Sequence, residues 1–79
     1  MNLNRGMMIN IEGIECCILD VQNINETTYI YVAEILDEDI TENFYVYKVI
    51  SENKFEKVID SDSLKSILPV FIESIQESL

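Results

Sequence analysis

The sequence contains no histidine, only two glycines and only two cysteines among its 79 residues. Without histidine there is no Cys–His or Ser–His pair to activate a nucleophile. Two glycines cannot form a glycine-rich phosphate loop. A tetrahedral zinc site needs spaced cysteine or histidine ligands, which the adjacent Cys16 and Cys17 do not provide. The sequence therefore predicts a protein that is not an enzyme and that binds no cofactor and no metal.

Basic residues are also scarce: five Lys and Arg stand against 15 Asp and Glu, for a formal net charge of −10. Such a charge repels the phosphates of nucleic acids and the surface of anionic membranes. We therefore expect no direct binding to nucleic acid or to a membrane. Two interpretations of the charge stay open. It attracts a basic protein surface, or it serves solubility alone.

The two cysteines are neighbours, and neighbouring side chains of a strand point to opposite faces. A disulfide between Cys16 and Cys17 would need an unusual backbone, so we expect free thiols. Free thiols fit a reducing cytoplasm. No stretch resembles a secretory signal or reaches the length of a transmembrane helix. The predicted location is the cytoplasm.

Apolar residues make up 48% of the sequence, too many for a disordered acidic tail. The length allows one domain, residues 1–79, of which residues 1–7 are expected to fray. Apolar and polar residues alternate with a period of two across residues 8–59, which predicts strands. The connections are short and favour antiparallel hairpins. The predicted strands are residues 8–12, 14–21, 27–36, 44–50 and 55–59, with a polar connection at 37–43 and tight turns near Asn25 and at 51–54.

The period changes to 3.6 near Asp60 and predicts a helical segment over residues 61–79. Its apolar stripe consists of Leu64, Ile67, Leu68, Phe71, Ile72, Ile75 and Leu79. Pro69 would disrupt the interior of a regular helix but is tolerated in a first turn. Either one helix from about Ser63 is kinked at Pro69, or a turn at 63–66 leads into a helix from about Ile67, which we favour. The predicted fold class is α+β: an antiparallel four- to five-stranded β-meander with one C-terminal amphipathic helix packed on one face.

One helix can cover only one face of such a sheet, although both faces carry bulky side chains. In residues 14–21, alternation places Cys17, Leu19 and Val21 opposite Ile14, Cys16 and Ile18. The aromatic candidates for the uncovered face are Tyr29, Tyr31, Tyr45 and Tyr47. Alternatively, sheet curvature and the N-terminal segment bury these tyrosines.

The densest charge cluster follows the third predicted strand and contains Asp37, Glu38, Asp39 and Glu42. Its spacing is a poor match to a calcium loop, because Glu42 occupies the position of the required glycine and Lys48 that of the bidentate glutamate. A rim of one charge steers a complementary partner, and aromatic side chains are common interface anchors. We therefore predict that the four acidic residues and the four tyrosines form an interaction surface.

Several short pieces of the chain carry a family resemblance. They are Glu12-Gly13-Ile14-Glu15, Ile18-Leu19-Asp20, Thr28-Tyr29-Ile30-Tyr31-Val32, Tyr45-Val46-Tyr47-Lys48 and Ile59-Asp60-Ser61-Asp62. In this order, before a closing helix, the chain resembles the YrzB-like small acidic proteins of Gram-positive bacteria, a family of unknown function. The resemblance implies a cytoplasmic bacterial protein. It carries no activity and no functional residues. Pro69, and the serines that dilute the acidic run at the helix entrance, depart from the family pattern.

These observations favour a non-enzymatic module that binds another protein, either a basic partner or a second copy of itself. The alternative is an acidic mimic of nucleic acid, of the phage type, that blocks the basic groove of a nucleic-acid-binding enzyme. Binding of such a mimic to a nuclease would be tight and sensitive to salt.

Overall fold

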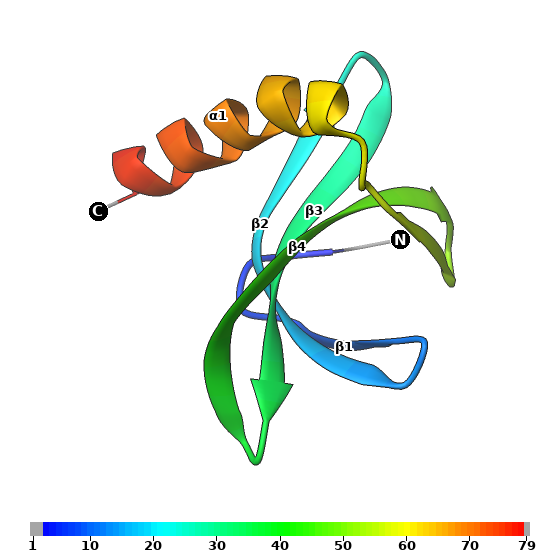
Figure 1. Cartoon of the computed structure of the whole chain (residues 1–79), viewed down its shortest axis with the longest axis vertical. Coiled ribbons are helices and arrows are strands. Elements are labelled where there is room, and N and C mark those ends of the chain that lie inside the picture. Colours follow the sequence, from blue (N-terminus) through cyan, green and yellow to red (C-terminus); the bar gives the residue numbers. More distant parts are fainter. Residues whose placement is uncertain (1–2, 79) are drawn as a thin grey trace.

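The computed structural model describes residues 3–78, which form a five-stranded antiparallel sheet followed by one helix (Figure 1). The elements are β1 (Met8–Ile11), β2 (Ile14–Ile24), β3 (Thr27–Leu36), β4 (Asp39–Ser51), β5 (Lys54–Lys57) and α1 (Ser61–Glu77). The strands lie in the order β1-β2-β3-β4-β5, so every strand pairs with its neighbour along the chain. The α+β class and the meander are as predicted. None of the helices among residues 3–78 is long and apolar enough to cross a membrane.

Three of the hairpins turn through two residues with positive φ: Glu12-Gly13 (52° and 85°), Asn25-Glu26 (51° and 66°) and Asp37-Glu38 (52° and 67°). Two successive left-handed residues define a type I′ turn, whose twist matches the right-handed twist of the flanking strands. The fourth hairpin pairs Ser51 with Lys54, as the sequence predicts. Tight turns of this kind leave little loop between the strands.

The prediction of a polar connection over residues 37–43 is wrong beyond the turn, because β4 begins at Asp39. The register between β3 and β4 shifts between Ala33 and Ile35. There the Thr41 hydroxyl donates to the Glu34 carbonyl at 2.8 Å and accepts from the Asn43 N–H at 3.2 Å. A polar side chain thus bridges a bulge, and the strand continues through a sequence without clear alternation.

A second bulge, in β2, reverses the predicted faces of its last residues. Ile18 lies opposite Val32, and Asp20 lies opposite Tyr31, so Leu19 is the extra residue. An inserted residue moves every later side chain to the other face. Val21 therefore joins the face of Ile18, instead of opposing it as predicted.

The sheet curls around a first core to which all five strands contribute. Its buried members are Ile11, Cys16, Ile18, Ile30, Val32 and Tyr47, and Leu3, Ile9, Ile14, Val21, Tyr45, Val49 and Phe55 pack around them. Because side chains from the two outer strands, β1 and β5, reach the same cluster, the curvature of the sheet itself buries this face.

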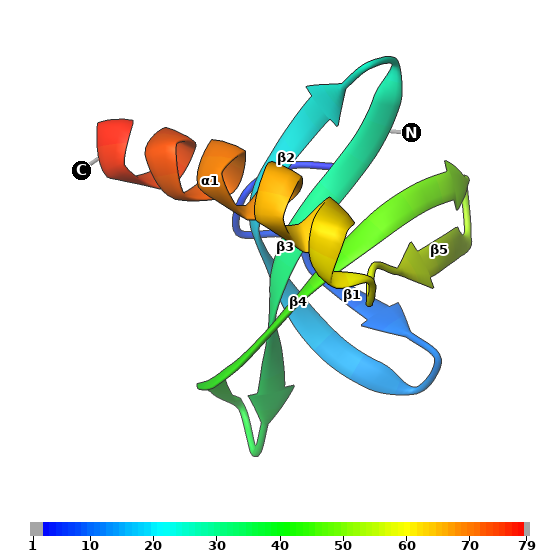
Figure 2. The same cartoon turned by 45° about the horizontal axis from the view of Figure 1, so that its top comes forward.

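A second core joins the opposite face to α1. Val46 packs with Ile67 and Phe71, and the Phe71 ring stacks on Tyr31 with centroids 5.5 Å apart. In Figures 1 and 2, α1 crosses over β2 and β3. The stripe residue Leu79 lies outside the described residues.

The preferred prediction that the helix starts near Ile67 is wrong, because α1 runs unbroken from Ser61 through Pro69. Asp60 caps its start, accepting a hydrogen bond from the Ser63 N–H at 2.9 Å. Pro69 deprives the Lys65 carbonyl of its donor four residues on. Both residues are exposed, so water can replace the missing donor.

Candidate interaction surface

The four tyrosines do not form one surface. Tyr31 lies opposite Val46, and Val32 lies opposite Tyr45. This register puts Tyr29 and Tyr31 on the face beneath α1, whereas Tyr45 and Tyr47 face the core inside the curled sheet. The prediction of a shared, uncovered face is therefore wrong. A difference of one residue in register decides the face, and alternation within each strand cannot reveal it.

Tyr45 and Tyr47 belong to the core packing. Tyr47 is only 4% exposed. Burial raises the pKa of its hydroxyl, and the nearby Cys16 and Glu12 raise this pKa further. The Tyr45 ring lies 6.4 Å from that of Tyr47 and carries the Lys57 ammonium 4.3 Å from its centroid. Such contacts stabilise the sheet and leave little of Tyr47 for a partner, whereas the half-buried Tyr45 also lines the groove described below.

The predicted acidic residues do lie together. Asp37 and Glu38 form the turn between β3 and β4, Asp39 is the first residue of β4, and Glu42 follows in its bulge. All four are exposed. Within residues 3–78 the ion pair is that of Arg5 with Asp20, so these carboxylates have no basic partner there. We call these four residues the acidic hairpin.

An apolar groove of about 370 Å³ lies between the start of α1 and the adjoining face of β3 and β4. Its lining is apolar or aromatic except for one lysine: Tyr31, Phe44, Tyr45, Val46, Lys57, Val58, Ile59, Leu64 and Leu68. Ile59 is 78% exposed and Phe44 is 47% exposed. The Phe44 ring stacks on Tyr31 at 5.7 Å, which in turn stacks on Phe71. Exposed apolar side chains gathered over a packed base are typical of interaction sites.

Sequence reasoning missed this groove, although one signal for it was present. Ile59 precedes the helix cap Asp60, and Leu64 is the fourth residue of α1. An apolar pair at these positions forms a hydrophobic staple. The sequence predicts Ile59 as the end of the last strand, but β5 ends at Lys57 and leaves Ile59 in the link to α1.

The carboxylates and thiols of residues 3–78 were compared with the arrangement that a metal ion needs, and the two cysteines with that of an exposed thiol. Among residues 3–78, no three side chains of His, Cys, Asp or Glu are placed to hold a metal ion. Cys16 and Cys17 are free and buried. Burial raises the pKa of the Cys16 thiol, with a further rise from Glu34 and an opposing effect of Lys57. A protonated, buried thiol is a poor nucleophile.

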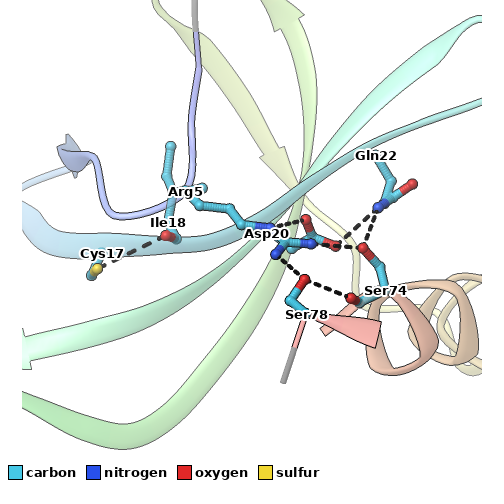
Figure 3. Close-up of polar contacts among 7 residues, drawn as sticks. All are labelled: Arg5, Cys17, Ile18, Asp20, Gln22, Ser74 and Ser78. Atoms are coloured by element: carbon cyan, nitrogen blue, oxygen red, sulfur yellow. Dashed lines mark hydrogen bonds and ion pairs between the residues drawn. The ribbon is translucent and has the colours of Figure 1, made fainter. Parts of the chain in front are cut away.

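One polar network lies away from the groove, at the other end of α1 (Figure 3). Asp20, only 2% exposed, accepts from Arg5 Nε at 2.8 Å and from Gln22 Nε2 at 3.0 Å. The guanidinium of Arg5 also donates to the hydroxyls of Ser74, at 2.8 Å, and Ser78, and Gln22 Nε2 donates to Ser74 at 2.9 Å. These hydrogen bonds join β2 to the N-terminal segment and to the last turns of α1.

Hydrogen bonds to β2 hold part of residues 1–7, the N-terminal segment that the sequence predicts to fray. Gly6 donates its N–H to the Ile18 carbonyl at 2.7 Å, and the Ile18 N–H donates to Met7 at 2.9 Å. Residues 5–7 are thus bound to β2. Met1 and Asn2, also expected to fray, lie outside the described residues.

Comparison of the chain with protein-family models, with curated proteins and with solved structures finds no match. The resemblance to the YrzB-like family therefore stays a prediction. The geometry of the groove and of the acidic hairpin is what bears on function.

Proposed function

We propose that this chain is a non-enzymatic, cytoplasmic protein-interaction module whose apolar groove binds a basic region of a partner protein. The observation that carries the proposal is the groove with its exposed apolar residues Ile59 and Phe44, in a molecule whose unpaired acidic hairpin ends at Glu42, two residues before Phe44 in β4. The exposed apolar side chains provide surface for a partner to bury, and the acidic hairpin favours a partner of opposite charge.

The anchors supply binding free energy. Burying one large apolar side chain contributes about 1.5–3 kcal/mol, so Ile59 and Phe44, together with the half-buried Leu64 and Leu68, supply part of the binding free energy. The acidic hairpin raises the association rate and the selectivity of binding, because a negatively charged patch attracts basic surfaces and repels acidic ones.

The nucleic-acid mimic stays the alternative proposal, supported by the net charge of −10. A mimic presents its charge to a basic groove and has no use for an apolar anchor. Its binding would weaken with salt and would be indifferent to the loss of Ile59. A groove-bound partner would be sensitive to that loss at every salt concentration.

Photo-crosslinking within the organism that encodes the chain tests the proposal. Phe44→p-benzoylphenylalanine places the probe in the groove, and Ile72→p-benzoylphenylalanine is the matched control, because Ile72 is 49% exposed on α1 and lies outside the groove lining. We expect one dominant protein adduct from position 44, weakened by an added Ile59→Ser substitution and absent from position 72. Equal adducts from both positions, or none from either, would overturn the proposal.

A further inference from the structure

The outer edge of β4 is only partly occupied. β5 pairs with β4 through Tyr47, Lys48, Val49 and Ser51, and the Val58 N–H then donates to the Val46 carbonyl at 2.9 Å. Beyond that point the chain leaves β4 for α1. In Figure 2, β5 accompanies only one end of β4. Among the described strands, residues 39–44 of β4 have β3 on one side and no strand on the other.

The backbone of Phe44 is directed at this open edge. Alternate residues of a strand direct their N–H and C=O groups to the same edge. The Val46 carbonyl points outward, to Val58, and the pairing with β3 is regular from Ala33–Phe44 to Tyr31–Val46. The N–H and C=O of Phe44 therefore point outward too, next to the groove that its ring lines. Donor, acceptor and apolar surface are offered together.

The charge along this edge selects its occupant. Edge strands are usually protected from pairing by bulges and charged side chains. Here Asp39 and Glu42 carry the same sign, so the edges of two copies repel each other. A basic strand meets attraction instead. The lysine of the groove, Lys57, is held over the Tyr45 ring and lies opposite Tyr47, eight residues along β4 from Asp39.

We propose that an extended segment of the partner, with alternating basic and apolar residues, adds as a strand to the open edge of β4. Its backbone bonds to that of Phe44, its apolar side chains enter the groove beside Ile59, and its basic side chains lie toward Asp39 and Glu42. Main-chain bonds supply affinity and alternate side chains supply specificity in this mode of recognition. The inference rests on the proposed function and specifies the chemistry of the partner.

Three synthetic peptides, each acetylated and amidated, test this mode by NMR titration of the labelled protein. The first alternates lysine and valine over about seven residues, enough to span the open edge. The second has the same composition with lysines and valines in separate blocks. The third is the first peptide with alternate backbone nitrogens methylated, which removes donors but keeps charge and side chains.

We expect the alternating peptide to shift the amide signals of Phe44, Ile59 and Leu64 and to slow hydrogen exchange of the Phe44 amide. The blocked and methylated peptides should bind about tenfold more weakly, because they lose side-chain placement or main-chain bonds. Ile59→Ser should weaken binding. Ile72→Ser, the same substitution at an exposed isoleucine outside the groove, should not.

Equal affinity for all three peptides would mean attraction by charge alone and would overturn strand addition. Shifts confined to another surface would overturn it as well. The crosslinking experiment is independent of these peptides. A partner captured through position 44 together with peptides that fail at the β4 edge would leave the proposed function standing and remove only this mode of binding.

Discussion

Asp20 is the buried charged residue of the described chain, and no buried polar atom of its side chain lacks a hydrogen-bond partner. Burial alone would raise the pKa of its carboxyl, but hydrogen bonds from Gln22, Arg5, Ser74 and the Val21 backbone outweigh burial and lower it. The ionised form is therefore the one that the fold binds. The bulge at Leu19 is what turns this carboxylate toward α1, where Arg5 and Ser74 meet it.

The lowered pKa of Asp20 predicts acid sensitivity. A carboxyl whose pKa is lower in the folded state stabilises the fold fully above the unfolded pKa, near 3.9, and loses this contribution as pH falls through the folded pKa. Asp20→Asn should reduce the free energy of unfolding at pH 7 by about 1–3 kcal/mol and flatten its decline in acid, measured by urea titrations between about pH 7 and pH 2. The N-cap carboxyl of Asp60 also has a lowered pKa, from its bonds with Ser63, so a shallower decline will persist.

Glu15→Gln is the control for that experiment, because Glu15 is an exposed strand residue. It should change stability little and keep the acid decline of the parent chain. An Asp20→Asn variant with the same decline as the parent would show that the network does not depend on the ionised carboxylate.

At the scale of elements, the hairpin turns contain the non-glycine residues of the described chain that have a positive φ. Left-handed conformations are occupied by Glu12, Asn25, Glu26, Asp37 and Glu38. Each non-glycine residue there costs roughly 1 kcal/mol, less for asparagine. The type I′ geometry requires these angles, and the strand pairing on either side maintains them.

Glu26→Gly should therefore stabilise the protein. It creates the Asn-Gly pair that type I′ turns prefer, at a position where φ is 66°. Relief of strain should exceed the entropy lost by glycine and leave a gain of about 0.5–1 kcal/mol, measured by thermal and urea unfolding. Glu52→Gly is the control: its turn joins β4 to β5 and its φ is not positive, so glycine there should be neutral or destabilising. Equal effects of both changes would refute the strain argument.

Elements with a regular pattern were predictable, and irregular ones were not. The strand Thr27–Leu36 was predicted with its observed bounds, because β-branched and aromatic residues fill it. A period of two carries no sign of an inserted residue, so the bulges near Leu19 and Thr41 escaped prediction. The start of the helix was predicted wrongly because the free-energy cost of Pro69 depends on whether the carbonyl without a donor is exposed to water. That exposure is decided by how the helix packs.

The candidate site divides in the same way. The acidic hairpin could be predicted, since its residues are contiguous in the sequence. The groove could not, because it combines β3, β4 and the start of α1, and its shape depends on where β5 stops. The four tyrosines were predicted on one face, which is wrong, because the register between β3 and β4 decides their faces and cannot be predicted from alternation.

At the scale of the whole molecule, two kinds of contact differ in their separation along the chain. All strand pairs join sequence neighbours through short turns. The network around Asp20 instead joins Arg5 to Ser74 and Ser78, 69 and 73 residues away. It brings the segment before β1 and the last turns of α1 onto one strand, β2 (Figure 3).

That long link has a kinetic consequence. Local hairpins close early in folding, whereas contacts between distant residues wait for the rest of the chain. Arg5 should therefore bind its partners after the transition state, so Arg5→Met should speed unfolding and leave the folding rate nearly unchanged in stopped-flow chevron plots. A variant that mainly folded more slowly would place the link in the nucleus. Because its contacts form late, Arg5 sets the lifetime of the native molecule and has little influence on the time that folding takes.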